Sequence, residues 1–517
     1  MPLNFLKPYA PLLLSLAAGS ILPLAFAPFN VALMALIAPA LLLALLHQQS
    51  IKSALLRSYL FGLGGFGVGA SWIYVSIATY GNAPILLAVL HTSVFVATLA
   101  LFPAVVGGLL NYFFPQPNLS RALLAFPALW VLLEISRGWI LSGFPWLYLG
   151  YSQLQSALSS FAPVLGIWGV SLVCAILSGI FYQVGHLLLT QQGTRKKYTA
   201  LMMMVLGLYG SAYLLAQPHW TTPSTQPLKV TLVQGNISQH LKWEPQHIQH
   251  IIDTYYRLTL PYFGHAELII WPEAAIPLPL PYSAPFFSQL QQQLHNTPTT
   301  LITGVPVQVP EKNQYYNALI SINGATARHA TQDLALGHYY KQHLVPFGEY
   351  VPLESWLRGL IDFFDLPMSS FIGQAPHLNP ALQSHSLTIA SAICYEIAYP
   401  LLVRSRLAES ADILLTVSND TWFGHSIGPA QHLQIAQFRA LETGRYVIRA
   451  TNTGLTAVID PKGQLQALAP SFREYVLNST VKGMQGTTPW QSFGIWPVLA
   501  LLCLALLMAY LTKETQQ

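Results

Sequence analysis

The sequence predicts a protein of two fold classes: a bundle of apolar membrane helices and a water-soluble domain of alternating strands and helices. Of its 517 residues, 53% are hydrophobic and 8% are charged, whereas an ordinary soluble domain carries about 25% charged residues. Charge is also unevenly placed, because residues 1–216 hold eight of the 24 Lys and Arg but one of the 19 acidic residues. This pattern excludes a disordered chain and a purely cytosolic enzyme.

Seven apolar runs precede residue 217, and each supplies about the ~20 residues that a helix needs to cross ~30 Å of hydrocarbon. The first two are short and share a turn at Pro28, which predicts a hairpin that dips or tilts. An eighth run covers Phe493–Leu511. We therefore expect about eight transmembrane helices, seven of them in a membrane domain over 1–216 and the last over 491–517, followed by a short tail. The first seven runs cover about 9–27, 30–46, 55–78, 84–113, 122–141, 161–190 and 197–215.

The basic residues predict how these helices are oriented. Cytoplasmic loops carry an excess of Lys and Arg, and with eight spans a single side receives every basic residue of the ends and short loops except Arg137. Both termini should then be cytoplasmic, and the domain 217–490 should be periplasmic in a bacterial inner membrane. The net charge of +5 thus reflects membrane-flanking residues and not a nucleic-acid surface. The flanking residues are Lys7, Lys52, Arg57, Arg121, Arg195, Lys196, Lys197 and Lys513.

Residues 217–490 have normal polarity and alternate strand-like with helical stretches, which predicts one large domain of layered α/β architecture. The helical stretches are Gln246–Leu258, Ala284–Leu294 and Ala430–Leu441. The strand-like runs are Leu228–Gln234, Glu267–Trp271, Thr300–Val305, Ala318–Ile322, Leu387–Ile393, Ile413–Val417 and Thr456–Ile459.

Cys394 is the single cysteine of this domain and directly follows the predicted strand Leu387–Ile393. Cys174 and Cys503 lie within apolar runs, where a thiol usually acts as a small hydrophobic side chain. A strand end presents a side chain in the way that a nucleophile needs. Cys394 is therefore a candidate nucleophile, with a buried structural thiol as the alternative.

Glu273 and Lys341 are candidate partners for this thiol. Glu273 stands just past a predicted strand, after the proline that ends it, and Lys341 opens a segment that runs to Glu349. Either residue alone is interpreted equally well as a solvated side chain of a loop.

Together these motifs are too specific to be unrelated. Trp271-Pro272-Glu273, then Lys341 with Pro346-Phe347-Gly348-Glu349, then Cys394-Tyr395-Glu396 resemble the Glu–Lys–Cys set of the nitrilase superfamily. With seven apolar runs before the domain and one after it, the whole chain resembles the bacterial apolipoprotein N-acyltransferases. Two further segments match that family: Val233-Gln234-Gly235-Asn236 through Lys242-Trp243, and Ser418 through Gly424.

The resemblance implies a four-layer αββα sandwich and a ping-pong acyl transfer. Cys394 would attack an acyl ester of a membrane phospholipid, typically phosphatidylethanolamine, and release a lysophospholipid. The thioester would pass its acyl group to the α-amine of a diacylglyceryl-cysteine at a lipoprotein N-terminus. The implied roles are proton transfer for Glu273, charge stabilisation for Lys341, support for Glu349 and Glu396, and a substrate pocket shaped by Trp243, Tyr395 and Trp422.

Two other functions are weighed against this one. A membrane-tethered nitrilase-type amidase would use the same three residues with water as acyl acceptor, but a small soluble amide needs no membrane body. A transporter or sensor with an outer binding domain is disfavoured because the apolar runs hold few candidate interior charges, Glu134 and Arg137. We expect no metal, since the 16 histidines show no metal-ligand spacing. We also expect no other cofactor and a monomeric protein.

One amphipathic pattern follows Glu349. Leu353, Trp356, Leu357, Leu360, Ile361 and Phe364 recur at helical spacing. This predicts a helix that either packs on the domain core or lies on the bilayer as a movable lid over Cys394.

Overall fold

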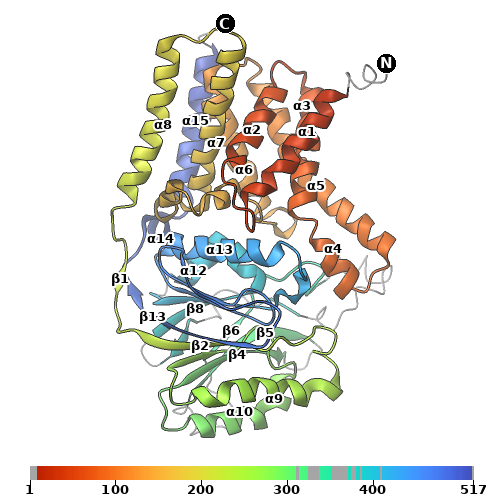
Figure 1. The fold of residues 1–517 in the computed structure, drawn as a ribbon, viewed down its shortest axis with the longest axis vertical. Helices are drawn as coiled ribbons and strands as arrows, with labels where there is room; N and C mark the ends of the chain where they lie inside the picture. Colours follow the sequence, from red (N-terminus) through yellow and green to blue (C-terminus); the bar gives the residue numbers. More distant parts are fainter. Residues whose placement is uncertain are drawn as a thin grey trace. The chain divides into compact units, whose positions relative to one another are not determined.

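The structure is a computed structural model that describes residues 9–309, 314–323, 337–350, 371–373, 380–384, 387–407 and 410–514 (Figure 1). The chain forms two compact units. The first comprises residues 1–74, 84–219 and 492–517, and the second comprises residues 75–83 and 220–491. The predicted helix over 353–364 lies outside the described residues.

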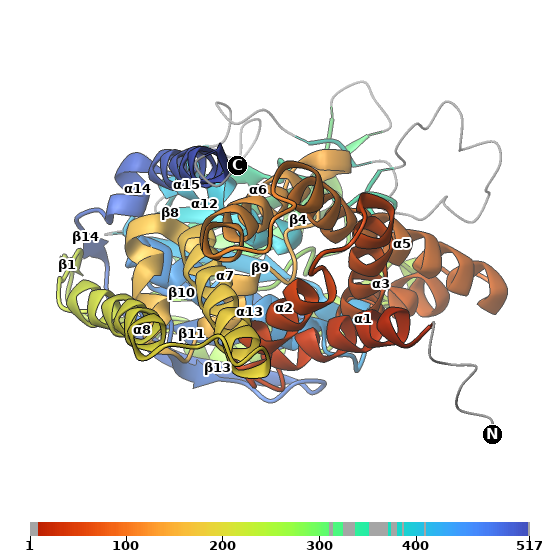
Figure 2. The ribbon, with the colours of Figure 1, turned by 90° about the horizontal axis from the view of Figure 1, so that it is seen from above.

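The first unit is built from helices, of which α8 and α15 are seen nearly end-on in Figure 2. Among the described residues, four helical segments are long and apolar enough to cross a membrane: Ile85–Phe113, Ala157–Leu189, Arg195–Leu215 and Trp496–Lys513. The α-helices are α1 (Ala10–Ile21), α2 (Met34–Leu45), α3 (Ile51–Gly69), α4 (Ile73–Val75, ending at the unit boundary), α5 (Ile85–Phe113), α6 (Phe126–Arg137), α7 (Ala162–Leu189), α8 (Arg195–Leu215) and α15 (Trp496–Glu514).

The prediction of about eight spans is not confirmed. The described residues give four candidates, or five if α3 and the segment Ile73–Tyr80, bent by 60° relative to each other, count as one span. Helices α1, α2 and α6 have 12 residues each, which is a rise of about 18 Å, well short of ~30 Å. Apolar residues continue past the ends of α1 and α6, so the sequence pattern overestimates the length of these helices.

Glycines let the helices of the first unit pack closely. A Cβ added at Gly64 of α3 would lie 2.2 Å from the Leu16 carbonyl oxygen on α1. A Cβ at Gly62 would lie 2.7 Å from the Ala100 Cα on α5. The glycine pattern of α3 therefore serves contact between helices, as small residues do in membrane proteins.

The second unit contains two six-stranded sheets over the described residues. One has the order β13-β2-β3-β4-β5-β6, with β2, β3 and β4 parallel, and the other has the order β12-β11-β10-β9-β8-β7, with β8, β9 and β10 parallel. The strands are β2 (Leu228–Gln234), β3 (Leu268–Ile270), β4 (Thr300–Gln308), β5 (Tyr315–Asn323), β6 (His338–Tyr340), β7 (Leu382–Ser384), β8 (Leu387–Ile393), β9 (Ile413–Ser418), β10 (Val447–Thr451), β11 (Ala457–Ile459), β12 (Leu465–Leu468) and β13 (Tyr475–Val481), and β1 (Thr222–Pro223) pairs with β14 (Met484–Gln485).

Alternating side chains arrange these sheets in four layers. Leu268 and Ile270 of β3 join Ile413 and Leu415 of β9 in the core between the sheets. Ile269 instead faces α9 (Ile248–Thr259) and α10 (Leu280–Leu294), whereas Leu414 of the other sheet faces α12 (Pro400–Leu407) and α13 (Gly428–Thr443). Figure 1 shows these helix pairs on the outer faces of the sheets. A period of two in each strand thus produces the αββα order.

The strand and helix predictions for this unit are largely confirmed. Strands β2 and β8 have the predicted bounds, and β3, β4, β5, β9 and β11 overlap the predicted runs. The three predicted helices appear as α9, α10 and α13. The pattern missed α12 and the strands β6, β7, β10, β12 and β13, most of which are short or carry polar residues. A short helix, α14 (Pro489–Phe493), ends at the unit boundary.

Candidate active site

Cys394 lies at the carboxyl end of β8, where the chain turns into a short 3₁₀ helix. Its φ is +55°, a left-handed conformation that costs a residue with a Cβ about 1–2 kcal/mol. Its Sγ lies 3.4 Å from Oγ of Ser418, the last residue of β9. Because β8 and β9 are parallel, their carboxyl ends meet at one edge of the sheet, and the thiol is placed there.

Glu273 follows β3 in the other sheet and is buried. Its Oε1 accepts a hydrogen bond of 2.8 Å from Asn317 Nδ2, and its Oε2 accepts one of 2.9 Å from the Asn419 backbone N–H. The turn after Glu273 presses on β4, since a Cβ at Gly304 would lie 2.3 Å from Ala274 N. These contacts hold the carboxylate in one orientation.

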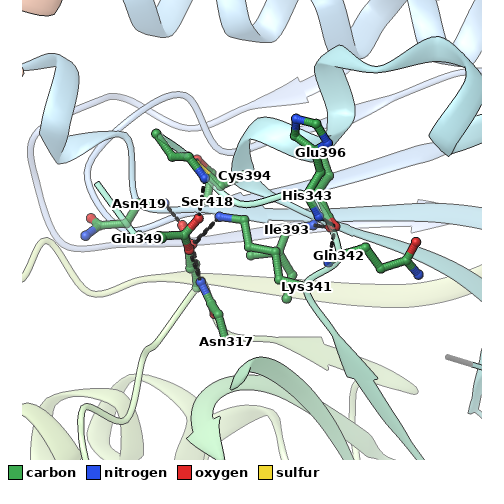
Figure 3. A network of polar contacts seen from close by, with 12 residues as sticks. Asn317, Lys341, Gln342, His343, Glu349, Ile393, Cys394, Glu396, Ser418 and Asn419 are labelled. Carbon is green, nitrogen blue, oxygen red and sulfur yellow. Dashed lines mark hydrogen bonds and ion pairs between the residues drawn. The ribbon is translucent and has the colours of Figure 1, made fainter. Parts of the chain in front are cut away.

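Lys341 follows β6 and is also buried, with its ammonium between two carboxylates (Figure 3). Its Nζ lies 2.8 Å from Glu349 Oε1 and 3.4 Å from Glu273 Oε1. Asn317 Nδ2 donates to both of those oxygens. Burial by itself lowers the pKa of Lys341, but Glu349 and Glu273 outweigh it and raise the pKa, so the lysine stays charged.

Glu349 and Glu396 hold the surrounding loops. The second oxygen of Glu349 accepts from the Val345 backbone N–H at 2.9 Å, which closes the loop that follows Lys341. Glu396 is fully buried, and it links the segment after Lys341 to the end of β8. Figure 3 shows it beside these backbone groups. Its carboxylate accepts from the backbone N–H groups of Gln342, His343 and Ile393 and from the Tyr339 hydroxyl, at 2.7 to 3.1 Å.

The Cys394 thiol is held in its neutral form. Burial raises its pKa, Glu273 raises it further, and Lys341 lowers it, with a net shift above the ordinary value. The site therefore combines a protonated thiol, a fixed carboxylate and a fixed ammonium. These groups can remove a proton, form a thioester and stabilise an oxyanion. Among the described residues, no cluster of three or more His, Cys, Asp or Glu could hold a metal ion.

The three aromatic residues predicted to shape a pocket belong to the same unit, Trp243 in a turn and Tyr395 and Trp422 in short 3₁₀ helices. Trp243 is half-buried, and its buried Nε1 has no acceptor among the described residues. The Tyr395 ring packs edge-on against Tyr399, with centroids 5.1 Å apart. The Trp422 ring contacts Tyr80 edge-on at 5.7 Å.

Comparison with known proteins identifies the group to which this site belongs. The family model "Apolipoprotein N-acyltransferase N-terminal domain" matches residues 18–180, and the model "Carbon-nitrogen hydrolase" matches residues 229–488. The apolipoprotein N-acyltransferase of Pseudomonas aeruginosa is 43% identical over 97% of this chain and 96% of that protein. Those of Azotobacter vinelandii (98% and 96% covered) and Vibrio cholerae (93% and 93% covered) are 41% and 42% identical.

The chain belongs to the apolipoprotein N-acyltransferase family. The likeness extends over both units, so it covers the apolar helices as well as the sheets. An apolipoprotein N-acyltransferase attaches an acyl group to a lipoprotein, and its substrates are therefore a lipoprotein and a lipid. The carbon–nitrogen hydrolase part contains every site residue predicted from the sequence.

Several polar residues at this candidate site were not predicted to take part in it. Asn317 bridges the two carboxylates, Lys242 donates from Nζ to the Glu273 carbonyl oxygen at 3.1 Å, and His432 donates to the Cys394 carbonyl oxygen. Lys242 and Asn419 lie in segments that matched the family motifs, which is the signal that could have drawn attention to them. Asn317 and His432 lie in a strand and a helix whose patterns give no such signal.

Proposed function

We propose that Glu273, Lys341 and Cys394 form the catalytic triad and transfer an acyl group by a ping-pong mechanism through a thioester on Cys394. The observation that carries this proposal is the Lys341 ammonium, fixed between Glu273 and Glu349 in the unit that presents a neutral thiol at a strand end. A neutral thiol needs a base at the moment of attack, and a buried ammonium beside that base supplies the charge that an oxyanion requires.

In the first half-reaction, Glu273 takes the thiol proton while Sγ attacks the carbonyl carbon of a phospholipid ester. The tetrahedral oxyanion forms near Lys341 and collapses as the ester C–O bond breaks. Glu273 returns the proton to the departing alkoxide, which leaves as the hydroxyl group of a lysophospholipid. The acyl group remains on Cys394 as a thioester.

In the second half-reaction, the neutral α-amine of a diacylglyceryl-cysteine attacks the thioester. Glu273 accepts a proton from the nitrogen as the C–N bond forms, and it returns that proton to the departing thiolate of Cys394. Glu349 keeps Lys341 in place during both steps, and Glu396 keeps the two loops together. The products are an amide on the lipoprotein and the resting enzyme.

The substrates in this proposal are a phospholipid, typically phosphatidylethanolamine, and a diacylglyceryl apolipoprotein. The pocket is lined by Trp243, Tyr395 and Trp422. The unpaired indole N–H of Trp243 supports a polar contact with one of the two substrates. An apolar pocket also delays attack by water on the thioester, which a transferase needs and an amidase does not.

We further propose that the enzyme is a monomer of the bacterial inner membrane with about eight spans, both termini cytoplasmic. Residues 1–216 would form the membrane domain, 217–490 the periplasmic catalytic domain, and 491–517 the last span and tail. The one-sided distribution of basic residues supports this orientation. The shorter apolar helices Ala10–Ala25 and Met34–Leu45, together with α6, would supply the spans beyond the long candidates.

Intact-mass measurement tests the proposed mechanism. Wild-type enzyme incubated with phosphatidylethanolamine should gain one fatty-acyl mass, which neutral hydroxylamine removes. Cys394→Ala and Glu273→Gln should gain none, because the first lacks the nucleophile and the second lacks the base. A diacylated peptide with a free N-terminal cysteine should discharge the acyl-enzyme within seconds, and the same peptide with an acetylated amine should leave it acylated for minutes.

Two outcomes would contradict the proposal. An acyl mass that persists in Cys394→Ala would move the nucleophile elsewhere. Free fatty acid released at one rate with and without the peptide would instead identify a tethered hydrolase, with water as the acceptor.

A further inference from the structure

A buried polar cluster lies behind Cys394 and takes no part in the mechanism above. It consists of Ser418, Asp420, His432 and Arg449, from β9, the loop that follows it, α13 and β10. All four side chains are inaccessible to solvent. Burying a carboxylate and a guanidinium is costly unless they pair, and Arg449 Nη2 donates to Asp420 Oδ2 at 2.5 Å. The pair supports two contacts with Cys394.

The first contact reaches the sulfur. Ser418 Oγ lies 2.6 Å from Asp420 Oδ1 and 3.4 Å from Cys394 Sγ. The carboxylate therefore orients the hydroxyl group that faces the thiol.

The second contact reaches the backbone of the nucleophile. His432 Nε2 lies 3.1 Å from the Cys394 carbonyl oxygen. A carbonyl oxygen only accepts, so Nε2 carries the hydrogen and donates it. His432 Nδ1 lies 3.1 Å from both Asp420 Oδ1 and Arg449 Nη2, which fixes the ring from its other side. Burial and then Arg449 lower the pKa of His432, so the neutral ring is favoured and Nδ1 accepts from Arg449.

This hydrogen bond bears on the strained conformation of Cys394. A peptide unit is planar, so a fixed carbonyl fixes the plane between Cys394 and Tyr395 and limits rotation about the Cys394 backbone bonds. At φ +55° the residue would gain about 1–2 kcal/mol by leaving the left-handed region, and that rotation would swing Sγ away from Ser418. The contact from His432 opposes that rotation.

We infer that His432, fixed by Asp420 and Arg449, is a positioning residue that holds the Cys394 backbone in its left-handed conformation and so keeps Sγ aligned for attack. The inference rests on the proposed role of Cys394 as nucleophile. The ring donates to the backbone carbonyl oxygen of Cys394 and is fully buried, so it acts through the backbone and touches no substrate atom.

Single-turnover acylation by phosphatidylethanolamine tests this inference, with the acyl-enzyme followed by intact mass. His432→Phe fills a similar volume but cannot donate a hydrogen bond. We expect its acylation rate constant at saturating phosphatidylethanolamine to fall ~100-fold, as for a misplaced reacting group. The phosphatidylethanolamine concentration that gives the half-maximal rate should stay unchanged, because the pocket is intact. His432→Gln retains an amide N–H and should recover the rate to within about tenfold of wild type.

The matched control is His425→Gln, since His425 is exposed and stacks on Phe472, and this variant should acylate at the wild-type rate. A His432→Phe enzyme with lower acyl-enzyme amplitude but an unchanged rate constant would overturn the inference, because His432 would then serve stability alone. If His432→Phe does not fold, a His432→Gln rate constant equal to that of a donor-free His432→Met enzyme overturns it equally. Failure of the proposed function is separate, since it would appear as absence of acyl-enzyme in wild type.

Discussion

Lys242 is a buried ammonium beside Glu273 that transfers no proton in the two half-reactions. Its Nζ donates to the Glu273 carbonyl oxygen and so holds the turn that carries the base. Burial lowers its pKa from 10.5 to about 8, against the opposing effect of Glu273 and Cys394. The positive charge is therefore present below pH 8 and is lost as the pH rises through that value. An ammonium near a developing oxyanion stabilises it, and a neutral amine does so less.

We therefore expect acyl-enzyme formation from phospholipid to slow above about pH 8 in wild type. Lys242→Met should have a lower rate and no such decline between pH 7 and 9. Single-turnover acylation across this range measures both, and it avoids the acceptor amine, which has its own titration. Lys229→Met is the control, because Lys229 is an exposed residue of β2. An alkaline decline that survives in Lys242→Met would assign the titration to another group.

At the scale of elements, the segment Val75–Ala83 belongs to a different unit from the residues on either side of it in the sequence. It follows α3 among the apolar helices, yet it groups with the catalytic unit. Ser76 Oγ donates to the Trp422 carbonyl oxygen at 2.7 Å, and the Tyr80 ring stacks on His240 at 5.6 Å. The loops that it touches are those of Asn419 and Lys242, which hold Glu273. The segment thus packs against the loops that hold the proposed base, Glu273.

We expect Ser76→Ala to slow acylation about fivefold, as the loss of one net hydrogen bond of about 1 kcal/mol implies if the loop shifts in the transition state. Tyr80→Leu should slow it further, and Tyr80→Phe should retain the ring contacts and the rate. The rate constant at saturating phospholipid is the measurement. Leu86→Ala, at an exposed position early in α5, is the control. Wild-type rates in both Ser76→Ala and Tyr80→Leu would show that the segment does not brace the site.

At the scale of the whole molecule, the apolar helices determine the expected membrane topology. Helix α8 is the clearest case, because it is a single apolar helix of 21 residues with three basic residues at its start. It separates the loop before residue 195 from the part of the catalytic unit that begins at residue 220. If α8 crosses the membrane, these two parts of the chain lie on opposite sides.

Single cysteines at Gln192 and Ser224 in a Cys-free chain test this arrangement. Both positions are exposed. A membrane-impermeant maleimide should label Ser224→Cys on intact spheroplasts and should label Gln192→Cys after permeabilisation alone, because the basic loop is expected inside. Labelling of both sites on intact cells would mean that α8 does not cross. Labelling of Gln192→Cys alone would reverse the orientation.

The sequence by itself determined the local features of this protein. Short strand-like runs located β2 and β8 with their correct bounds, and longer helical stretches located α9, α10 and α13. A strand end marked Cys394 as a candidate nucleophile, and the resemblance of its motif and of those around Glu273 and Lys341 to the nitrilase superfamily marked the candidate site. Composition separated the apolar part from the polar part. Each of these signals comes from residues that are close to one another along the chain.

The tertiary structure alone decided which distant residues meet. Glu273 accepts from the backbone of Asn419, 146 residues later, and lies against Lys341, 68 residues later. His432 reaches Cys394 from a helix whose own pattern reads as core. Such contacts follow from the order of strands in two sheets and the packing between them, and no period in the sequence encodes that order. The same reason limits the count of spans: composition shows that a run is apolar, but packing and backbone turns decide where its helix ends.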